Sequence, residues 1–327
     1  MTATRAISIL LVMTIVAVNA KQLPRTRSKR DFVANRGHIL RGHVISTHQV
    51  DNLGDCDEIC LNHPRCLSYN YQFDTRSSKH SCEINDATGT VCPQDMVPKR
   101  GYRYYEDQST TCARQCPTRD ASANFEFTYP NKAVTDYVRF DLLECAPPLT
   151  SFTVCLWMRT DDQSDDGTIF SYATPNEDND ILVTDYSNLK ILIGGSKKTF
   201  YTTTNDGGWH HICTTWENTA GAWGFYIDGQ LFDSGDGLSK GREIGNDGIF
   251  ILGQDQDDYG DGFEQVQSFN GEIYNVNMWN RVLPADEILH MSTDCDDGVG
   301  NYLRWKDFLD ADVYGDVTKT SPVSCVP

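Results

Sequence analysis

The residues most suited to chemistry in this sequence are oxygen donors gathered in one stretch. Asp255–Gln267 reads Asp-Gln-Asp-Asp-Tyr-Gly-Asp-Gly-Phe-Glu-Gln-Val-Gln, and an earlier pair, Asp178-Asn179, has the same character. Calcium takes roughly six to eight oxygen ligands from carboxylates, carbonyls and water, and the glycines let the backbone turn around an ion. By residue type alone a solvated acidic loop is the commoner outcome, so both interpretations remain open at this point.

No catalytic residue is assigned from the sequence. The pair His210-His211 lies outside any His-Glu-x-x-His pattern, which makes it weak evidence for a metal site. No phosphate-binding glycine loop is present. Glycosidases use two carboxylates, but the acidic residues here are the same ones that suit calcium. A binding protein is therefore expected rather than an enzyme.

The N-terminus has the features of a secretion signal. Arg5 precedes an apolar run that ends in Val18-Asn19-Ala20, whose small residues suit cleavage, so 1–20 is expected to be removed. The run is shorter than the ~20 residues of a membrane span, and no other segment is long and apolar enough to cross. A basic segment, 21–35, follows, in which Arg27–Arg30 resembles a furin-type site; a polar linker is the alternative.

Charge and cysteine content indicate the compartment and exclude some partners. The chain has 46 acidic and 28 basic residues and a formal net charge of −18, and such an acidic surface disfavours nucleic acid and anionic membranes. All 12 cysteines follow the signal segment. An even number in a secreted chain indicates disulfides rather than zinc thiolates. We therefore expect a secreted, extracellular protein without a nucleic-acid partner.

The second half of the chain has the pattern of one β-sandwich. Runs of apolar, β-branched and aromatic residues, typical of strands, recur at 152–158, 223–227, 249–252 and 273–279. The dipeptide Asp228-Gly229 favours a hairpin after the second run. One short helix is expected at Pro284–His290, with proline in its first turn. Many strands with a single helix favour a mainly β jelly roll.

The motif His211-Ile-Cys-Thr-Thr-Trp216 gives this region a family resemblance. It is similar to the His-x-Cys-x-Ser/Thr-Trp signature of the pentraxin family, that of C-reactive protein and serum amyloid P component. Three further stretches agree in order along the region: Phe170–Thr174, Ile251–Gln254 and Gly271–Trp279. The resemblance implies a concanavalin- or laminin-G-like jelly roll, a disulfide between Cys155 and Cys213, and a cyclic homo-oligomer.

The same resemblance implies two adjacent calcium ions held by residues of the acidic stretch and the earlier pair. The family's ligands carry over onto Asp178, Asn179, Asp255, Gln256, Asp257, Glu264 and Gln267. Asp178 and Asn179 would bind the first ion through side-chain oxygens, and Gln256 would offer its main-chain carbonyl. Asp255 and Asp257 would bridge both ions. Glu264 and Gln267 would complete the second. C-reactive protein has the longer Glu at the position of Asp255.

The ligand class follows from the positions beside these ions. In pentraxins an anionic phosphate or carboxylate oxygen completes the coordination, and C-reactive protein adds a Phe and a Glu that recognise choline. Those two positions fall on Thr184 and Lys197. Because Lys197 would repel an ammonium group, the resemblance predicts anionic ligands on cells or microbes, such as phosphorylated or acidic carbohydrates.

Residues 36–107 hold a cysteine cluster that resembles the small, disulfide-rich α+β PAN/apple domain. Cys56 and Cys60 would lie one turn apart on a helix capped by Asp55, followed by the strand-like Cys66-Leu-Ser-Tyr-Asn-Tyr and by Cys82-Glu-Ile-Asn. The resemblance implies the pairs Cys56–Cys82 and Cys60–Cys66, although sequence alone allows other connectivities. Six cysteines have no partner in either family pattern: Cys92, Cys112, Cys116, Cys145, Cys295 and Cys325. Some of them are expected to pair within the chain, for example to tie Cys325 near the C-terminus back to the body, and others could link subunits.

These features predict five segments: a signal (1–20), a basic segment (21–35), a PAN-like domain (36–107), a linker (108–120) and a pentraxin-like domain (121–327). The expected function is secreted, calcium-dependent and lectin-like recognition in innate immunity. The alternative is a matrix or adhesion protein that binds a protein partner through its PAN-like domain.

Overall fold

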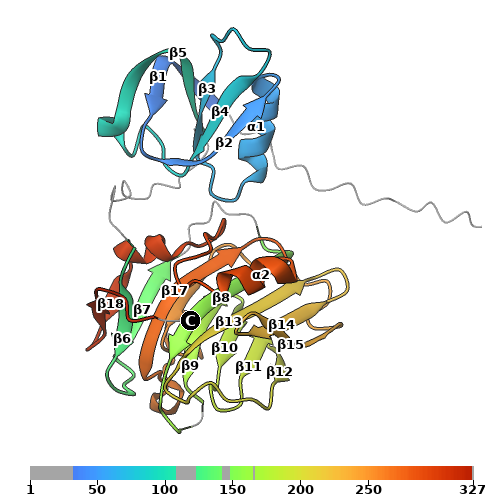
Figure 1. Ribbon diagram of the computed structural model, residues 1–327, viewed down its shortest axis with the longest axis vertical. Coiled ribbons are helices and arrows are strands. Elements are labelled where there is room, and N and C mark those ends of the chain that lie inside the picture. The colour runs from blue at the N-terminus through green and yellow to red at the C-terminus, as the bar shows by residue number, and fades with distance from the viewer. Residues whose placement is uncertain (1–31, 108–122, 142–147, 165, 326–327) are drawn as a thin grey trace, which may run out of the picture.

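The computed structural model describes residues 32–107, 123–141, 148–164 and 166–325. The expected signal segment 1–20, most of the basic segment and the linker 108–120 lie outside the described residues, as do Cys112, Cys116 and Cys145. A small N-terminal unit precedes a larger sandwich (Figure 1). Within the described ranges, no helix is long and apolar enough to cross a membrane.

The N-terminal unit is a five-stranded antiparallel sheet in the order β1-β5-β3-β4-β2 with one helix against it. Its elements are β1 (Phe32–Leu40), β2 (Val44–Val50), α1 (Leu53–Asn62), β3 (Ser68–Gln72), β4 (His80–Asn85), the 3-10 turn η1 (Pro93–Asp95) and β5 (Met96–Asp107). Disulfides join Cys56 of α1 to Cys82 of β4 and Cys60 of α1 to Cys66. These are the pairs that the PAN/apple resemblance implies, and they staple the helix to the sheet.

The N-cap of helix α1 lies three residues before the expected cap, Asp55. Asn52 is the N-cap, and its side-chain oxygen accepts a hydrogen bond from the Asp55 N–H at 3.2 Å. The Asp55 carboxylate in turn accepts from the Asp51 N–H at 3.0 Å. The prediction of Asp55 as the cap was wrong because Asp55 occupies the first helical turn, where its charge is favourable beside the free N–H groups.

The C-terminal unit contains two seven-stranded sheets. The first sheet has the order β12-β11-β10-β9-β16-β7-β18 and contains β7 (Tyr137–Asp141), β9 (Thr168–Thr174), β10 (Glu177–Thr184), β11 (Lys190–Ile193), β12 (Ser196–Thr199), β16 (Ile249–Leu252) and β18 (Asp312–Tyr314). The second has the order β15-β14-β13-β8-β17-β6-β19 and contains β6 (Glu126–Tyr129), β8 (Ser151–Arg159), β13 (Trp209–Glu217), β14 (Trp223–Ile227), β15 (Gln230–Gly235), β17 (Gly271–Trp279) and β19 (Thr318–Thr320). Three helical segments accompany the sheets: α2 (Ala285–Met291), η2 (Gln265–Gln267) and η3 (Trp305–Asp310).

The inward faces of the two sheets form one hydrophobic core. It contains large, fully buried side chains such as Trp216, Phe152, Phe170, Tyr172 and Phe250. The expected strands lie inside β8, β14, β16 and β17, and the expected helix is α2 with Pro284 as its N-cap. The predicted jelly-roll sandwich is confirmed.

The outer faces of the sandwich differ. On the second sheet, the disulfide Cys155–Cys213 joins directly opposed residues of β8 and β13 and packs with Ile288 and Met291 of α2. On the first sheet, Ser171 alternates with the core residues Phe170 and Tyr172, so it points outward. The acidic stretch after β16 folds onto that outward side, and it therefore lies on the face of the sandwich opposite α2.

A buried cluster of ion pairs joins the two units. Arg65 of the N-terminal unit binds Asp307 of η3 with two hydrogen bonds, of which the Nη2–Oδ1 bond measures 2.9 Å. In return, Arg304 of the sandwich donates to Asp86 of the N-terminal unit at 2.6 Å, and also to Asp307 at 2.9 Å. All four side chains are buried, with relative exposures between 5% and 9%. The contact therefore rests on fully desolvated charges.

Candidate calcium site

The loop after β16 brings most of the expected ligands into one electrostatic cluster. Asp255 is 7% exposed, and one of its carboxylate oxygens accepts a hydrogen bond from Gln267 Nε2 at 3.2 Å. Burial, followed by the charges of Asp257 and Asp178, raises the pKa of Asp255 to about 7. Burial and the neighbouring Glu264 raise the pKa of Asp257. Carboxylates from β10 and from the loop therefore lie close enough to oppose each other's ionisation.

Three of the expected ligand residues have a buried side-chain oxygen without a partner. In the described residues, nine buried side-chain nitrogen or oxygen atoms lack a hydrogen bond, and three of these are Asn179 Oδ1, Asp255 Oδ1 and Gln267 Oε1. They come from three different segments of the chain. A buried acceptor without a donor costs about 1–3 kcal/mol, and all three are acceptor oxygens of the type that calcium binds. The donor set therefore fits a calcium ion.

The side chain of Gln256 makes hydrogen bonds within the protein and is not directed at the carboxylate cluster. It is fully buried; its Nε2 donates to Ser171 Oγ at 2.7 Å and to the Ile249 carbonyl at 3.1 Å. Its Oε1 accepts from the Gly260 N–H at 3.1 Å. These bonds hold the loop against the outer face of the first sheet. Because these bonds use the side chain, Gln256 could offer only its main-chain carbonyl to an ion. This carbonyl is the group that the family resemblance implies.

The pair Asp178-Asn179 is positioned by residues that sequence reasoning missed. The next residue, Asp180, is 1% exposed and accepts from Arg242 Nε at 2.8 Å and from the Thr174 hydroxyl at 2.6 Å. The Gly195 N–H donates to the Asn179 carbonyl at 3.0 Å. These bonds fix the start of β10 beside the turn between β11 and β12. Arg242 gave no local signal because it lies 62 positions from Asp180.

The two expected pocket residues have different surroundings. Thr184 is 7% exposed, and its hydroxyl forms a hydrogen bond with the Thr168 hydroxyl at 2.8 Å. This bond joins the neighbouring strands β9 and β10. Lys197 is exposed on the edge strand β12 and lies opposite Leu192. Leu192 lies opposite Leu182, which lies opposite Ser171. Lys197 therefore shares the face of the acidic loop, about 10 Å (two strand spacings) from Leu182.

The histidines do not form a metal or catalytic centre with the nearby cysteines. His211 is 2% exposed and packs on Trp157, with ring centroids 5.1 Å apart, and burial lowers its pKa to about 4. Its neighbours Cys155 and Cys213 are joined in a disulfide. The buried His43 lies near Cys92 and Asp95, but Cys92 is also disulfide-bonded. Neither group therefore offers a thiolate to a metal.

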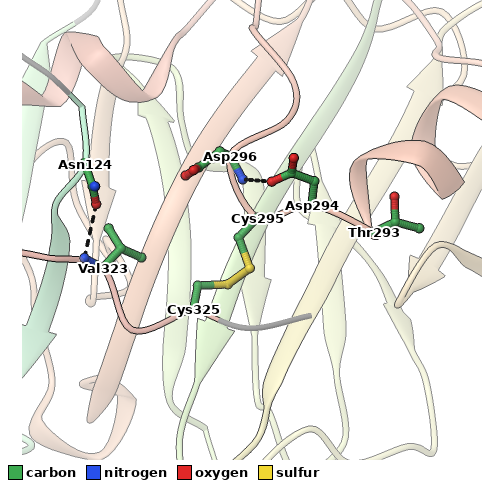
Figure 2. A pocket seen from close by; sticks show the side chains of 7 residues that line it. All are labelled: Asn124, Thr293, Asp294, Cys295, Asp296, Val323 and Cys325. Carbon is green, nitrogen blue, oxygen red and sulfur yellow. Dashed lines mark hydrogen bonds between the residues drawn. A yellow bond between two sulfur atoms is a disulfide. The ribbon is translucent and has the colours of Figure 1, made fainter.

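A separate hollow of about 260 Å³ lies beside the C-terminal disulfide (Figure 2). Cys295 is joined to Cys325, which ties the C-terminal segment to the body as expected. The Asp294 carboxylate accepts from the Asp296 N–H at 2.9 Å, and Asn124 Oδ1 accepts from the Val323 N–H at 3.1 Å. The Asn124 bond and the disulfide hold the C-terminal segment in place, whereas the Asp294 bond is local to its own loop.

Comparison with family models identifies both units. Residues 125–322 match the model described as the pentaxin family, and residues 29–110 match the PAN domain. A solved heptameric pentraxin similar to serum amyloid P component, from Limulus polyphemus, aligns with a TM-score of 0.54 at 24% identity. It covers 62% of this chain and 99% of that chain. This likeness shows the fold of the sandwich.

Curated relatives match the same region. The sequence is 40% identical over 191 residues to the rat sushi, von Willebrand factor type A, EGF and pentraxin domain-containing protein 1, covering 57% of this chain and 5% of that protein. It is 34% identical over 204 residues to human neuronal pentraxin-1, covering 62% of this chain and 46% of that protein. The chain thus spans less than half the length of these curated relatives.

Proposed function

Because this chain belongs to the pentaxin (pentraxin) family, we propose that it is a secreted recognition protein that binds anionic ligands through two calcium ions. The observation that carries the proposal is the group of three buried, unpartnered oxygens on Asn179, Asp255 and Gln267. Homologues in this family are binding proteins rather than enzymes. Lectin-like recognition in innate immunity is the role that this site suits.

The proposed ligands divide the two ions between the start of β10 and the loop after β16. Asp178 and Asn179 bind the first ion with their side chains, and Gln256 with its main-chain carbonyl. Asp255 and Asp257 bridge the two ions, and Glu264 and Gln267 complete the second. The ions supply a local positive charge large enough to reverse the field of an acidic protein. An anionic oxygen of the ligand then completes their coordination.

The position of Lys197 favours a ligand with a second anionic group. Lys197 is exposed on the face that carries the acidic loop, and its ammonium would repel the quaternary nitrogen of choline. Thr184 presents no free hydroxyl and no aromatic ring to a choline group. We therefore propose phosphorylated or acidic carbohydrates as the ligand class.

Calorimetry with excess calcium tests this proposal. The expected result is binding of a carboxylated sugar that EDTA abolishes, with Lys197→Gln weakening it several-fold. Lys79→Gln, which removes an exposed lysine of the N-terminal unit paired with Asp51, is the control and should leave binding unchanged. Tight binding of phosphocholine, or carboxylated-sugar binding that persists in EDTA, would contradict the proposal.

Multivalency would compensate for weak single sites. Extracellular calcium modules have dissociation constants of roughly 10⁻⁴–10⁻³ M, and several sites in one assembly gain avidity. The Limulus neighbour is heptameric by its own description, which supports the proposal of a homo-oligomer for this chain. Sedimentation of the secreted protein with and without calcium measures the number of subunits.

A further inference from the structure

Two arginines of the N-terminal unit face each other across neighbouring strands. In the ladder between β1 and β5, Arg36 lies directly opposite Arg103, and Arg103 lies opposite Tyr71 of β3. Figure 1 shows β1 and β5 side by side in this sheet. Directly opposed residues have Cβ atoms about 4.5–5.5 Å apart, and like charges in such a pair repel each other. The arrangement therefore costs free energy unless something compensates it.

Phe73 brings both guanidinium groups to one place. It follows β3 and shares the sheet face of Tyr69 and Tyr71, because side chains two residues apart point the same way. The guanidinium carbons of Arg103 and Arg36 lie 4.9 and 5.6 Å from the centroid of the Phe73 ring. Such cation–π contacts are worth about 0.5–1 kcal/mol at exposed sites. They orient the two cations without neutralising either.

Neither arginine has a carboxylate partner among the described residues. This is unusual within this acidic chain, because each described arginine of the sandwich is paired with an Asp or Glu: Arg139, Arg159, Arg242, Arg281 and Arg304. In addition, Arg103 Nε is buried and has no hydrogen-bond partner. Two adjacent cations and a buried free donor therefore remain for a group that is not part of the described chain.

The backbone leaves room for such a group. The β1–β5 register shifts directly after this pair, since His38 lies opposite Pro98 whereas Arg36 lies opposite Arg103. Gly37, between them, has a φ of +77° and nothing within 4 Å of the place where a Cβ would stand. Arg36 itself is exposed. The regular ladder is thus interrupted directly after the arginine pair, and Arg36 is open to solvent.

We propose that Arg36 and Arg103, oriented by Phe73, form a calcium-independent site for a tetrahedral oxyanion, a sulfate or phosphate ester. Guanidinium groups bind such anions with two parallel N–H donors each. A carboxylate has only two oxygens and is satisfied by one arginine, whereas a sulfate or phosphate ester has three terminal oxygens and suits two. The chain has a net charge of −18, which repels a polyanion. The two unpaired cations therefore suit a ligand with one charged group better than a polyanion.

The test measures anion binding by the full chain in EDTA. The probes are inorganic sulfate, inorganic phosphate and glucose 6-sulfate, titrated by calorimetry at constant ionic strength. We expect binding by the wild type and at least tenfold weaker binding by Arg36→Gln and by Arg103→Gln. Arg281→Gln removes an exposed, carboxylate-paired arginine of the sandwich and should bind as the wild type does. Binding of glucose 6-sulfate as well as free sulfate is the result expected for an ester ligand; binding of free sulfate alone would overturn that part of the proposal.

Thermal unfolding in chloride distinguishes an anion-binding role of Arg36 from a role in packing the N-terminal unit. Because the anion-free pair repels, Arg36→Gln should unfold at the same temperature as the wild type or higher. The sulfate-specific rise in unfolding temperature, beyond the general effect of sulfate on any protein, should disappear in that variant. A lower unfolding temperature in chloride, an undiminished sulfate effect in Arg36→Gln, or an equal loss in Arg281→Gln would overturn the proposal. Since calcium is absent throughout, failure here leaves the proposed calcium site untouched.

Discussion

At the scale of single residues, the proposed calcium site is unfavourable on its own. Asp255 is buried among Asp257 and Asp178, and its pKa of about 7 reflects that burial first and the neighbouring charges second. A site built in this way is expected to be strained without metal and stable with it. The seven positions followed from the family pattern, but the free oxygens on Asn179 and Gln267 did not. Whether an amide oxygen finds a donor depends on the packing around it, which residue types do not encode.

The substitution Asp255→Asn should have opposite effects with and without calcium. At pH 8, above the pKa of Asp255, the metal-free variant should gain roughly 1–2 kcal/mol of unfolding free energy because one repelling charge is removed. With calcium it should be less stable than the wild type and bind the ion at least tenfold more weakly. Thermal unfolding over a calcium titration measures both effects.

Asp258→Asn is the matched control for that experiment. Asp258 lies in the same loop and is exposed, and it is outside the proposed ligand set. It should change neither the metal-free stability nor the calcium response by more than about 0.5 kcal/mol. If Asp255→Asn destabilises the protein equally with and without calcium, Asp255 has a packing role and does not bind the ion.

Buried His211 should make the sandwich sensitive to acid. Its pKa is lowered by burial from 6.5 to about 4, so the unfolded chain takes up a proton at a pH where the folded protein does not. Its contribution is present above pH 6.5 and is lost as the pH falls toward 4. Between pH 7 and pH 5 the loss should be about 2 kcal/mol.

The variant His211→Phe isolates this effect because it keeps a ring against Trp157 and removes the titrating group. The difference in unfolding free energy between wild type and variant should therefore shift by about 2 kcal/mol in favour of the variant from pH 7 to pH 5. Denaturant unfolding at several pH values measures it. Burial also lowers the pKa of His63 to about 4, but that group is present in both proteins and cancels. A pH-independent difference would show that His211 does not titrate in this way.

At the scale of elements, alternation and apolar runs predicted the long strands well. Strands β8, β14, β16 and β17 are rich in apolar and aromatic residues, and their burial was readable from type. The short edge strand β12 has the sequence Ser-Lys-Lys-Thr, so no hydrophobic pattern marks it as a strand. It is recognised as one by its backbone pairing with β11. The cap of α1 was misplaced for a related reason. Asn52 and Asp55 are both good caps, and their mutual hydrogen bonds decide between them.

The C-terminal segment should depend on its disulfide. The bond Cys295–Cys325 closes a loop of 30 positions, and such a closure is worth about 3–4 kcal/mol. Strand β19 and the bonds of Ser324 to Glu126 lie within that segment. Replacing both cysteines by serine should lower the unfolding temperature and speed hydrogen exchange most at residues 318–324. Unchanged exchange there would mean that the ladder of β19 with β6 suffices.

At the scale of the whole molecule, two units that the sequence presents as separate are joined through charge. Arg65 and Asp307 are 242 positions apart, and no periodicity or motif connects residues at such a distance. Arg304 also has a local role, since it forms the capping box of η3 with Asp307. Each of these residues alone has the pattern of an ordinary surface charge. Only the docking of the two units makes them buried, and this contact was outside the reach of sequence reasoning.

The substitution Arg65→Met should loosen this contact while leaving each unit folded. Asp307 keeps its bonds to Arg304, so the sandwich loses no internal partner, but the interface loses a desolvated ion pair worth about 3 kcal/mol when one side is removed. Small-angle X-ray scattering should show a larger radius of gyration, and thermal unfolding should separate into two transitions. The matched control is Arg281→Met, which removes an exposed pair with Glu287 inside the sandwich and should cost less than about 1 kcal/mol. If Arg65→Met scatters and unfolds as the wild type does, the Arg65–Asp307 ion pair is not what holds the two units together.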